Sequence, residues 1–148
     1  MEAGTSGRGR REDFRLLTGS GRYTADWNLA GQAHAVFLRS DRAHAEIASL
    51  DTAAARALPG VVAVFTGADV VKAQFKTPPA ILFMKGKGGS TLKLPHRHAL
   101  AHERVRFVGE PVALVVAESE AAAQDGTERI VIEYRDLVAV VTPEVLVA

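Results

Sequence analysis

The order of apolar and polar positions along the chain predicts strands separated by short helices. The runs 61–65 and 112–117 are wholly apolar and rich in valine, which is typical of buried strands. Over 32–39, apolar residues fall on both faces of the expected strand, so we expect both faces to be covered. Further strands are predicted over 45–50, 104–108, 130–134 and 138–141.

Alanine-rich stretches between these strands predict the helices. Residues 51–58 should be helical, because alanine has the highest helix propensity and Asp51 can cap the first turn. The pair Pro59–Gly60 ends this helix, since proline cannot continue it and glycine adopts the left-handed cap. Two further helices are predicted over 68–73 and 119–128.

Two stretches, 45–65 and 112–134, follow the order strand, helix, strand. Each crossover is long enough to join parallel strands. We therefore expect an α/β (α+β) domain in which short helices pack on a mixed sheet. Residues 74–94 contain paired prolines and paired glycines and predict a long irregular loop, with a hydrophobic anchor at 81–84.

Composition narrows the class of protein. The 148 residues are 47% hydrophobic and 24% charged, which fits one globular domain. A net charge of +1 and the lack of an apolar run of roughly 20 residues give no reason to expect a nucleic-acid or membrane partner. The chain has no cysteine, which excludes disulfides, a thiolate nucleophile and iron–sulfur ligation within it.

The amino terminus differs in composition from the rest. Residues 1–11 are rich in glycine and arginine and predict a flexible arm, which the domain follows over 12–148. Phosphate binding by Arg8, Arg10 and Arg11 is the alternative to a charged or docking arm. No apolar stretch follows the arm, as it would in a secretory signal, so we expect a cytoplasmic protein.

Three histidines, His96, His98 and His102, are the first candidates for chemistry, because imidazole binds zinc, copper or nickel. A structural zinc site needs four ligands, and no cysteine is present to complete the set. His96 also follows Pro95 in a loop. We therefore expect solvated or hydrogen-bonded histidines and no metal site.

Two other groupings resemble catalytic pairs. Glu133 and Asp136 could serve as paired carboxylates, but Arg135 stands between them and is expected to neutralise them. Ser90 and Thr91 lie near histidines, yet both residue types are common in glycine-rich loops. The residues alone thus predict a globular α/β domain with no catalytic, cofactor-binding or metal-binding residue.

Four groups of residues, in order along the chain, carry a family resemblance. They read REDxRLLTGxGRYxxD over 11–26, RSxxAHAxI and LPGVVAVxTxxD over 39–69, VRFVGEPVAxVVA over 105–117, and IEYxxLxAVVxPE over 132–144. From about Arg11 onward the chain resembles the first domain, an α/β hammerhead, of the large chains in the xanthine dehydrogenase, aldehyde oxidase and carbon monoxide dehydrogenase family. The stretch 105–117 is the strongest match.

The resemblance implies a non-catalytic structural domain, or a split subunit, of a molybdenum hydroxylase. Large chains of the family continue for several times this length, and the continuation holds the molybdopterin contacts and the glutamate base. Iron–sulfur clusters and FAD sit on other domains or subunits. The alternatives are a stand-alone interaction or small-molecule-binding domain that has kept the fold, and an independent metal–histidine enzyme.

The implied partner is the remaining molybdenum-binding polypeptide of the large chain, with iron–sulfur and flavin subunits and a second copy of the chain as further candidates. A domain that packs inside a large enzyme should expose an apolar patch when it stands alone. We expect the interface to comprise the turn and part of the long loop, namely Phe107, Val108, Gly109, Glu110, Pro111, Phe83 and Met84.

The matching residues also have expected local roles. His44 stands beside small alanines, so its ring can hydrogen-bond locally without crowding. Gly109 permits a tight turn, and Glu110 is held extended by the following proline. Gly126 departs from the alanine- and leucine-rich pattern of the family's last helix and is expected to weaken that helix by roughly 1 kcal/mol.

Overall fold

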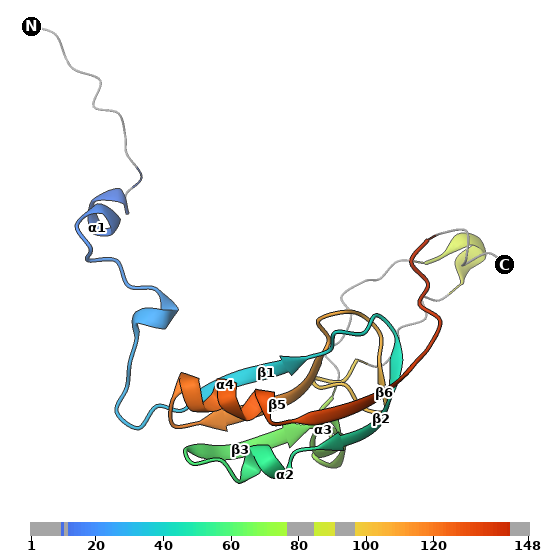
Figure 1. Ribbon diagram of the computed structural model, residues 1–148. Helices are drawn as coiled ribbons and strands as arrows, with labels where there is room; N and C mark the ends of the chain where they lie inside the picture. The colour runs from blue at the N-terminus through green and yellow to red at the C-terminus, as the bar shows by residue number, and fades with distance from the viewer. Residues whose placement is uncertain (1–9, 11, 77–84, 91–96, 143–148) are drawn as a thin grey trace, which may run out of the picture. The chain divides into compact units, whose positions relative to one another are not determined.

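The computed structural model describes residues 10, 12–76, 85–90 and 97–142. The chain divides into two compact units, Met1–Gln32 and Ala33–Ala148, which we call the amino-terminal unit and the main unit. Figure 1 shows the strands and the longest helix in the main unit. In the described ranges, no helix has the length and apolar character needed to cross a bilayer.

Local hydrogen bonds shape the described residues of the amino-terminal unit, 10 and 12–32. It contains the helix α1 (Asp13–Leu17), which buries none of its side chains, and the 3-10 turn η1 (Thr24–Asp26). The Thr18 hydroxyl donates to the Phe14 carbonyl at 2.8 Å and ends α1, while the Tyr23 amide donates to Asp26 Oδ2 at 2.7 Å and begins η1. The Arg22 guanidinium lies 5.2 Å from the centre of the Trp27 ring.

Six strands of the main unit form two antiparallel sheets of three strands each. The first sheet has the order β1 (His34–Arg39), β5 (Pro111–Ala117), β3 (Val61–Thr66). The second has the order β4 (Arg104–Val105), β2 (Ala45–Asp51), β6 (Val131–Asp136). The helical segments are α2 (Ala53–Arg56), α3 (Gly67–Lys72), η2 (Lys87–Gly89) and α4 (Glu120–Glu128).

The α/β class is confirmed, but two antiparallel sheets stand in place of the predicted single mixed sheet. The helix α2 leads from β2 in the second sheet to β3 in the first, and α4 leads from β5 in the first to β6 in the second. Each crossover therefore changes sheet. A parallel pair needs a crossover that returns to the same sheet, so none forms in the described residues.

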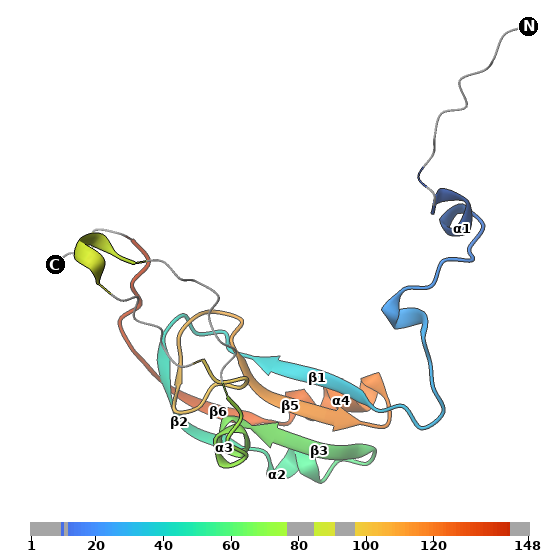
Figure 2. The same cartoon turned by 180° about the vertical axis from the view of Figure 1, so that it is seen from behind.

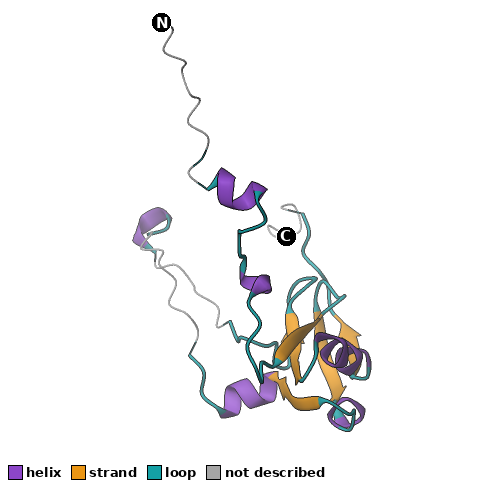
Figure 3. Cartoon of the chain, turned by 90° about the vertical axis from the view of Figure 1, so that its left-hand side faces the viewer, coloured by secondary structure: helices purple, strands orange, loops and turns teal. Residues whose placement is uncertain are grey.

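The two sheets share a continuous core. Leu50 of β2 and Ile132 of β6 pack against both clusters of buried side chains and so join the sheets. Figure 3 shows the strands gathered in one block with helices at its periphery. The cluster under α4 comprises Ala55, Val64, Ala113, Val115, Ala117, Ala123 and Ile130, and the second comprises Ala45, Ala101, Val105 and Val112.

Helix α4 covers the first sheet and depends on a glycine to do so. The Ser119 hydroxyl accepts the Ala122 amide hydrogen at 3.2 Å and begins the helix, as predicted. A Cβ atom at Gly126 would lie 2.7 Å from Val115 Cγ1 and 3.4 Å from Val61 Cγ2. Whatever its cost in helix propensity, Gly126 allows the helix to pack directly on β5 and β3.

Two predicted elements are shorter in the structure. The helix predicted over 51–58 is confined to α2, and Asp51 belongs to β2, although its Oδ1 still accepts the Ala53 amide hydrogen at 2.8 Å. The strand predicted over 104–108 is only the two-residue β4, because the chain turns directly after it. Local propensity predicts that these elements exist, but tertiary packing sets their ends.

The run 138–141 is not a strand, contrary to the prediction. The Leu137 amide donates to the His44 carbonyl at 2.9 Å, which extends the pairing of β2 with β6 by one residue. Beyond that point the valines have no partner strand in the described part of the chain. Without strand pairing, the side chains of Val138, Val140 and Val141 remain at the surface.

Candidate functional site

The histidines that the sequence singles out do not form a metal centre in the described residues. The rings of His98 and His102 lie edge to face, with their centroids 6.1 Å apart. His102 Nε2 lies 3.6 Å from Glu103 Oε1. His96 falls outside the described residues. Within the described ranges, no three side chains of His, Asp or Glu are grouped so that they could hold a metal ion.

The two carboxylates, Glu133 and Asp136, do not form a catalytic pair. They are three positions apart on β6, so they point to opposite faces of the strand. The prediction that Arg135 neutralises them is wrong, because Arg135 binds Glu46 across the β2–β6 pair. Asp136 instead lies 3.5 Å from the Arg42 guanidinium.

Glu46 is the centre of the ion pairs on the second sheet. It stands opposite Arg104 of β4 and Arg135 of β6 in the register. The hydrogen bond from Arg135 lowers the pKa of the Glu46 carboxyl below its ordinary value of 4.5, and the charge of Arg104 acts in the same direction. This arrangement links the three strands and leaves the carboxylate unsuited to accept a proton near neutral pH.

The serine–threonine pair of the long loop is only half described. The Ser90 carbonyl accepts the Gly86 amide hydrogen at 2.9 Å and closes the turn around η2. Thr91 lies outside the described residues, as do Phe83 and Met84 of the predicted interface. The structure therefore gives no geometry for a nucleophile at this loop.

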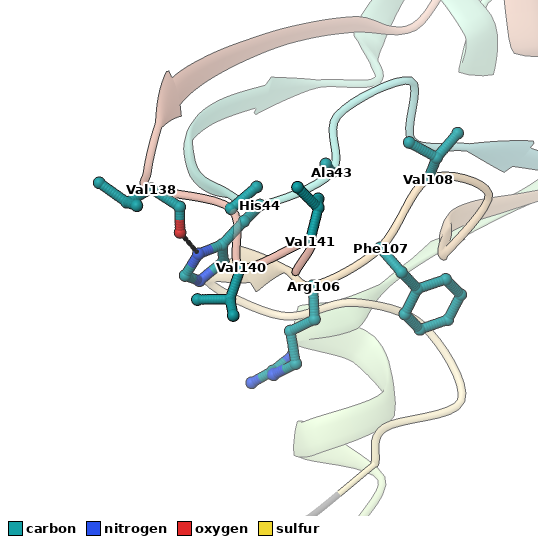
Figure 4. Close-up of a pocket in the computed structure, with 9 residues that line it drawn as sticks. Ala43, His44, Arg106, Phe107, Val108, Val138, Val140 and Val141 are labelled. Carbon is teal, nitrogen blue, oxygen red and sulfur yellow. Dashed lines mark hydrogen bonds between the residues drawn. The ribbon is translucent and has the colours of Figure 1, made fainter. Parts of the chain in front are cut away.

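A surface hollow of about 430 Å³ lies between the start of β2, the turn after β4 and the segment that follows β6 (Figure 4). Its wall is mainly apolar, and its two ionisable side chains are His44 and Arg106. The lining residues are Ala43, His44, Arg106, Phe107, Val108, Val138, Ala139, Val140 and Val141.

Hydrogen bonds fix the turn after β4 at both of its ends. The Arg106 amide donates to Glu110 Oε2 at 2.5 Å, and the Glu110 amide donates to the Phe107 carbonyl at 3.2 Å. Gly109 has a φ of +90°, which favours glycine, and its amide donates to the Ser40 carbonyl at 2.7 Å. These hydrogen bonds fix the backbone of the turn, from which Phe107 and Val108 project.

His44 attaches the segment after β6 to the same hollow. Its Nδ1 donates to the Val138 carbonyl at 2.8 Å, and its own carbonyl accepts from the Leu137 amide at 2.9 Å. The side chain makes a structural hydrogen bond, as expected. The expected local partner is wrong, because Val138 is 94 positions away in sequence.

The predicted interface residues divide into two groups. Phe107 and Val108 are 55% and 64% exposed and line the hollow, whereas Glu110 uses its carboxylate within the turn and Pro111 begins β5. The exposed valines beside them were not predicted as interface residues, because their apolar run resembles a strand. We call the exposed apolar set the rim: Phe107, Val108, Val138, Val140 and Val141.

The hollow does not offer the groups that catalysis or a metal-bearing cofactor would need. The Arg106 guanidinium is directed to the Arg104 carbonyl at 3.2 Å and to Glu110 at 3.6 Å. Of the lining residues, only His44 could act as a base: its Nδ1 donates to the Val138 carbonyl, which leaves Nε2 as the basic nitrogen. No carboxylate, hydroxyl or thiol of the described residues lines the hollow to form a catalytic pair with it. The geometry fits an apolar contact surface better than a reaction site.

Comparison with known proteins shows which family has this architecture. Residues 18–138 match the family described as aldehyde oxidase and xanthine dehydrogenase, a/b hammerhead domain. The chain belongs to this family. It is 44% identical over 140 residues to the nicotine 6-hydroxylase large subunit of Paenarthrobacter nicotinovorans, a match that covers 90% of this chain and 16% of that protein.

Solved structures of the family have the same fold over nearly the whole chain. Quinoline 2-oxidoreductase from Pseudomonas putida 86 matches with a TM-score of 0.81 and 46% identity, over 93% of this chain and 17% of that one. The Cu,Mo-CO dehydrogenase matches with a TM-score of 0.75 and 37% identity, over 93% and 16%. The chain thus spans about a sixth of the length of these relatives.

Proposed function

We propose that this chain is a structural, non-catalytic domain of a molybdenum hydroxylase large chain. One observation carries the proposal: a hammerhead-family match over 18–138, in a chain that spans about a sixth of the length of its relatives. The relatives include a nicotine hydroxylase, a quinoline oxidoreductase and a CO dehydrogenase. The reaction of the parent enzyme is then an oxidation, and its substrate is chosen by the other five sixths of the polypeptide.

The molybdenum cofactor belongs outside this chain in our proposal. One relative is a copper- and molybdenum-containing enzyme. This chain has no cysteine, and its described residues contain no group of side chains suited to a metal ion. Such a cofactor is therefore held by the remaining large-chain polypeptide, with iron–sulfur clusters and FAD on further domains or subunits.

The rim is the surface by which the domain packs on the molybdenum-binding polypeptide. Its five side chains are apolar and exposed, and they surround one hollow. Apolar patches of this kind mark contact sites on soluble proteins. Bonds within the turn and the His44 bond hold part of the rim in place, so docking costs little conformational entropy. Phe83 and Met84 join this surface in the proposal on the strength of the sequence alone.

Metal and activity measurements on the isolated chain test the proposal. The 148-residue chain is produced in a host supplied with molybdate and purified, and its molybdenum is quantified by mass spectrometry. We expect no molybdenum and no oxidation of purines, aldehydes or carbon monoxide. A stoichiometric amount of molybdenum in the isolated chain would contradict the assignment.

A further inference from the structure

A second apolar surface lies on the first sheet, on the face turned away from α4. Phe37 and Phe65 each pair with Leu114 in the strand register, and Ala35 pairs with Val116. Residues paired in this way share a face and contact one another across the strands. Figure 2 shows β1, β5 and β3 side by side. We call this surface the outer face: Ala35, Phe37, Ala63, Phe65, Leu114 and Val116.

The pattern of alternation identifies the outer face as distinct from the core. Of the intervening residues, Val115 belongs to the cluster beneath α4, and Val36 and Leu38 pack against it. Side chains of a strand alternate between faces, so the outer face points away from that cluster. Phe37 and Phe65 are each 45% exposed.

Every one of the six positions is apolar, and this is unusual for a sheet face in water. An antiparallel sheet with one solvated face normally alternates apolar and polar residues. Here α4 and its cluster already cover one face, yet the other face carries no polar side chain at these positions. Arg39 closes one end of the face, with its guanidinium 5.6 Å from the centre of the Phe37 ring.

We propose that the outer face is a docking surface, covered in the parent enzyme by the remaining polypeptide of the large chain. This inference rests on the proposed function and adds a second contact surface to the rim. The chain spans 16–17% of the relatives, so most of the large-chain polypeptide is available to pack on it. Covering this face removes two aromatic side chains from water, which favours association.

Hydroxyl-radical footprinting tests the inference directly, because it reports the solvent access of single side chains. The two samples are the isolated chain, diluted until it is monomeric, and the parent enzyme purified from its native host. A reference peptide added to both samples normalises the radical dose. We expect Phe37 and Phe65 to react freely in the isolated chain and several-fold more slowly in the parent enzyme.

Three results would overturn the inference. Equal rates in the two samples mean that no large-chain polypeptide covers the face. Slow rates in the dilute monomer mean that another segment of this chain covers it. Slowing that depends on the concentration of the isolated chain identifies a second copy as the occupant. Failure of the proposed function has a different signature, since the complex that contains the chain would then hold no molybdenum.

A pair of variants gives an independent readout. The double variant Phe37→Ser, Phe65→Ser changes the outer face, and Val131→Ser, 60% exposed on β6, is the control. The thermal unfolding of each isolated chain shows whether it folds. We expect the double variant to fold alone but to yield markedly less assembled, molybdenum-containing enzyme than the control. Equal yields would overturn the inference. If the double variant does not fold, the footprinting of the wild-type chain tests the inference instead.

Discussion

A single missing methyl group at position 126 sets how closely α4 approaches the sheet. Gly67, at the start of α3, likewise lies close to the loop before β4, since a Cβ atom there would lie 2.1 Å from the Ala101 carbonyl oxygen. Neither requirement was visible in the sequence, since the crowding atoms come from strands or loops that are distant along the chain. The turn role of Gly109 was predictable, because glycine readily adopts a positive φ such as the +90° found there.

The first residue-scale prediction concerns the sign of a glycine substitution. An alanine in a helix interior normally stabilises a protein relative to glycine. Gly126→Ala should instead lower the free energy of unfolding by about 2 kcal/mol, because its methyl group overlaps Val115. Chemical denaturation measures this, with Gln124→Ala on the exposed side of α4 as the control. A more stable Gly126→Ala chain would contradict the packing described here.

Asp69 gives the second residue-scale prediction. Its Oδ2 accepts hydrogen bonds from the amide and the hydroxyl of Thr66, each at 2.8 Å, and the amide bond is the main cause of its lowered pKa. A lowered folded-state pKa means that the carboxylate stabilises the fold above its ordinary pKa of 3.8 and ceases to do so as the pH falls through the lower folded value.

Asp69→Asn should therefore cost about 1 kcal/mol at neutral pH. The difference from the wild type should shrink as the pH falls below 3.8. Urea denaturation over a series of pH values measures both quantities. A difference that is the same at acidic and neutral pH would show that the carboxylate charge plays no part.

At the scale of elements, periodicity predicted where strands and helices occur but not which strands pair. The runs over β3 and β5 were clear from valine content, and Ser119 marked the start of α4. The division into two sheets was not predictable, because a strand–helix–strand order fits either one sheet or two. The apolar run 138–141 resembled a strand, but without a partner strand it became part of the rim.

The attachment of that run to β2 yields an element-scale prediction. His44→Ala removes the hydrogen bond to the Val138 carbonyl, so the amide of Leu137 should exchange with solvent faster. His44→Asn can still donate from its side-chain amide and should restore part of the protection. Hydrogen exchange followed by mass spectrometry measures both variants, with β5 as an internal reference that should not change. Unchanged exchange at Leu137 in His44→Ala would show that the hydrogen bond does not hold the segment.

At the scale of the whole molecule, the described residues present two apolar surfaces, the rim and the outer face. The sequence led to Phe107 and Val108 through their place in a family-like segment, while the rim valines and the outer face required the fold. Apolar residues in a sequence do not reveal which of them the core will leave exposed. That information comes only from the pairing of strands that are far apart in the chain.

The rim supplies a prediction at this scale. The double variant Phe107→Ser, Val108→Ser should lower the yield of assembled parent enzyme, because both side chains are exposed in the domain and buried at the proposed contact. The isolated domain should keep its stability to within about 0.5 kcal/mol, since surface substitutions seldom cost more. The yield of assembled enzyme measures the effect, with Val131→Ser as the control. A yield equal to that of the control would show that the rim is not part of the interface.

The most direct test of the central claim is the state of this chain in its native host. An antibody raised against the 148-residue chain captures whatever contains it, and the captured species is then measured for mass and molybdenum. We predict a species several times heavier than 15.8 kDa that carries molybdenum in stoichiometric amount. A molybdenum-free species of about the chain's own mass, from cells whose other molybdenum enzymes are loaded, would contradict the account.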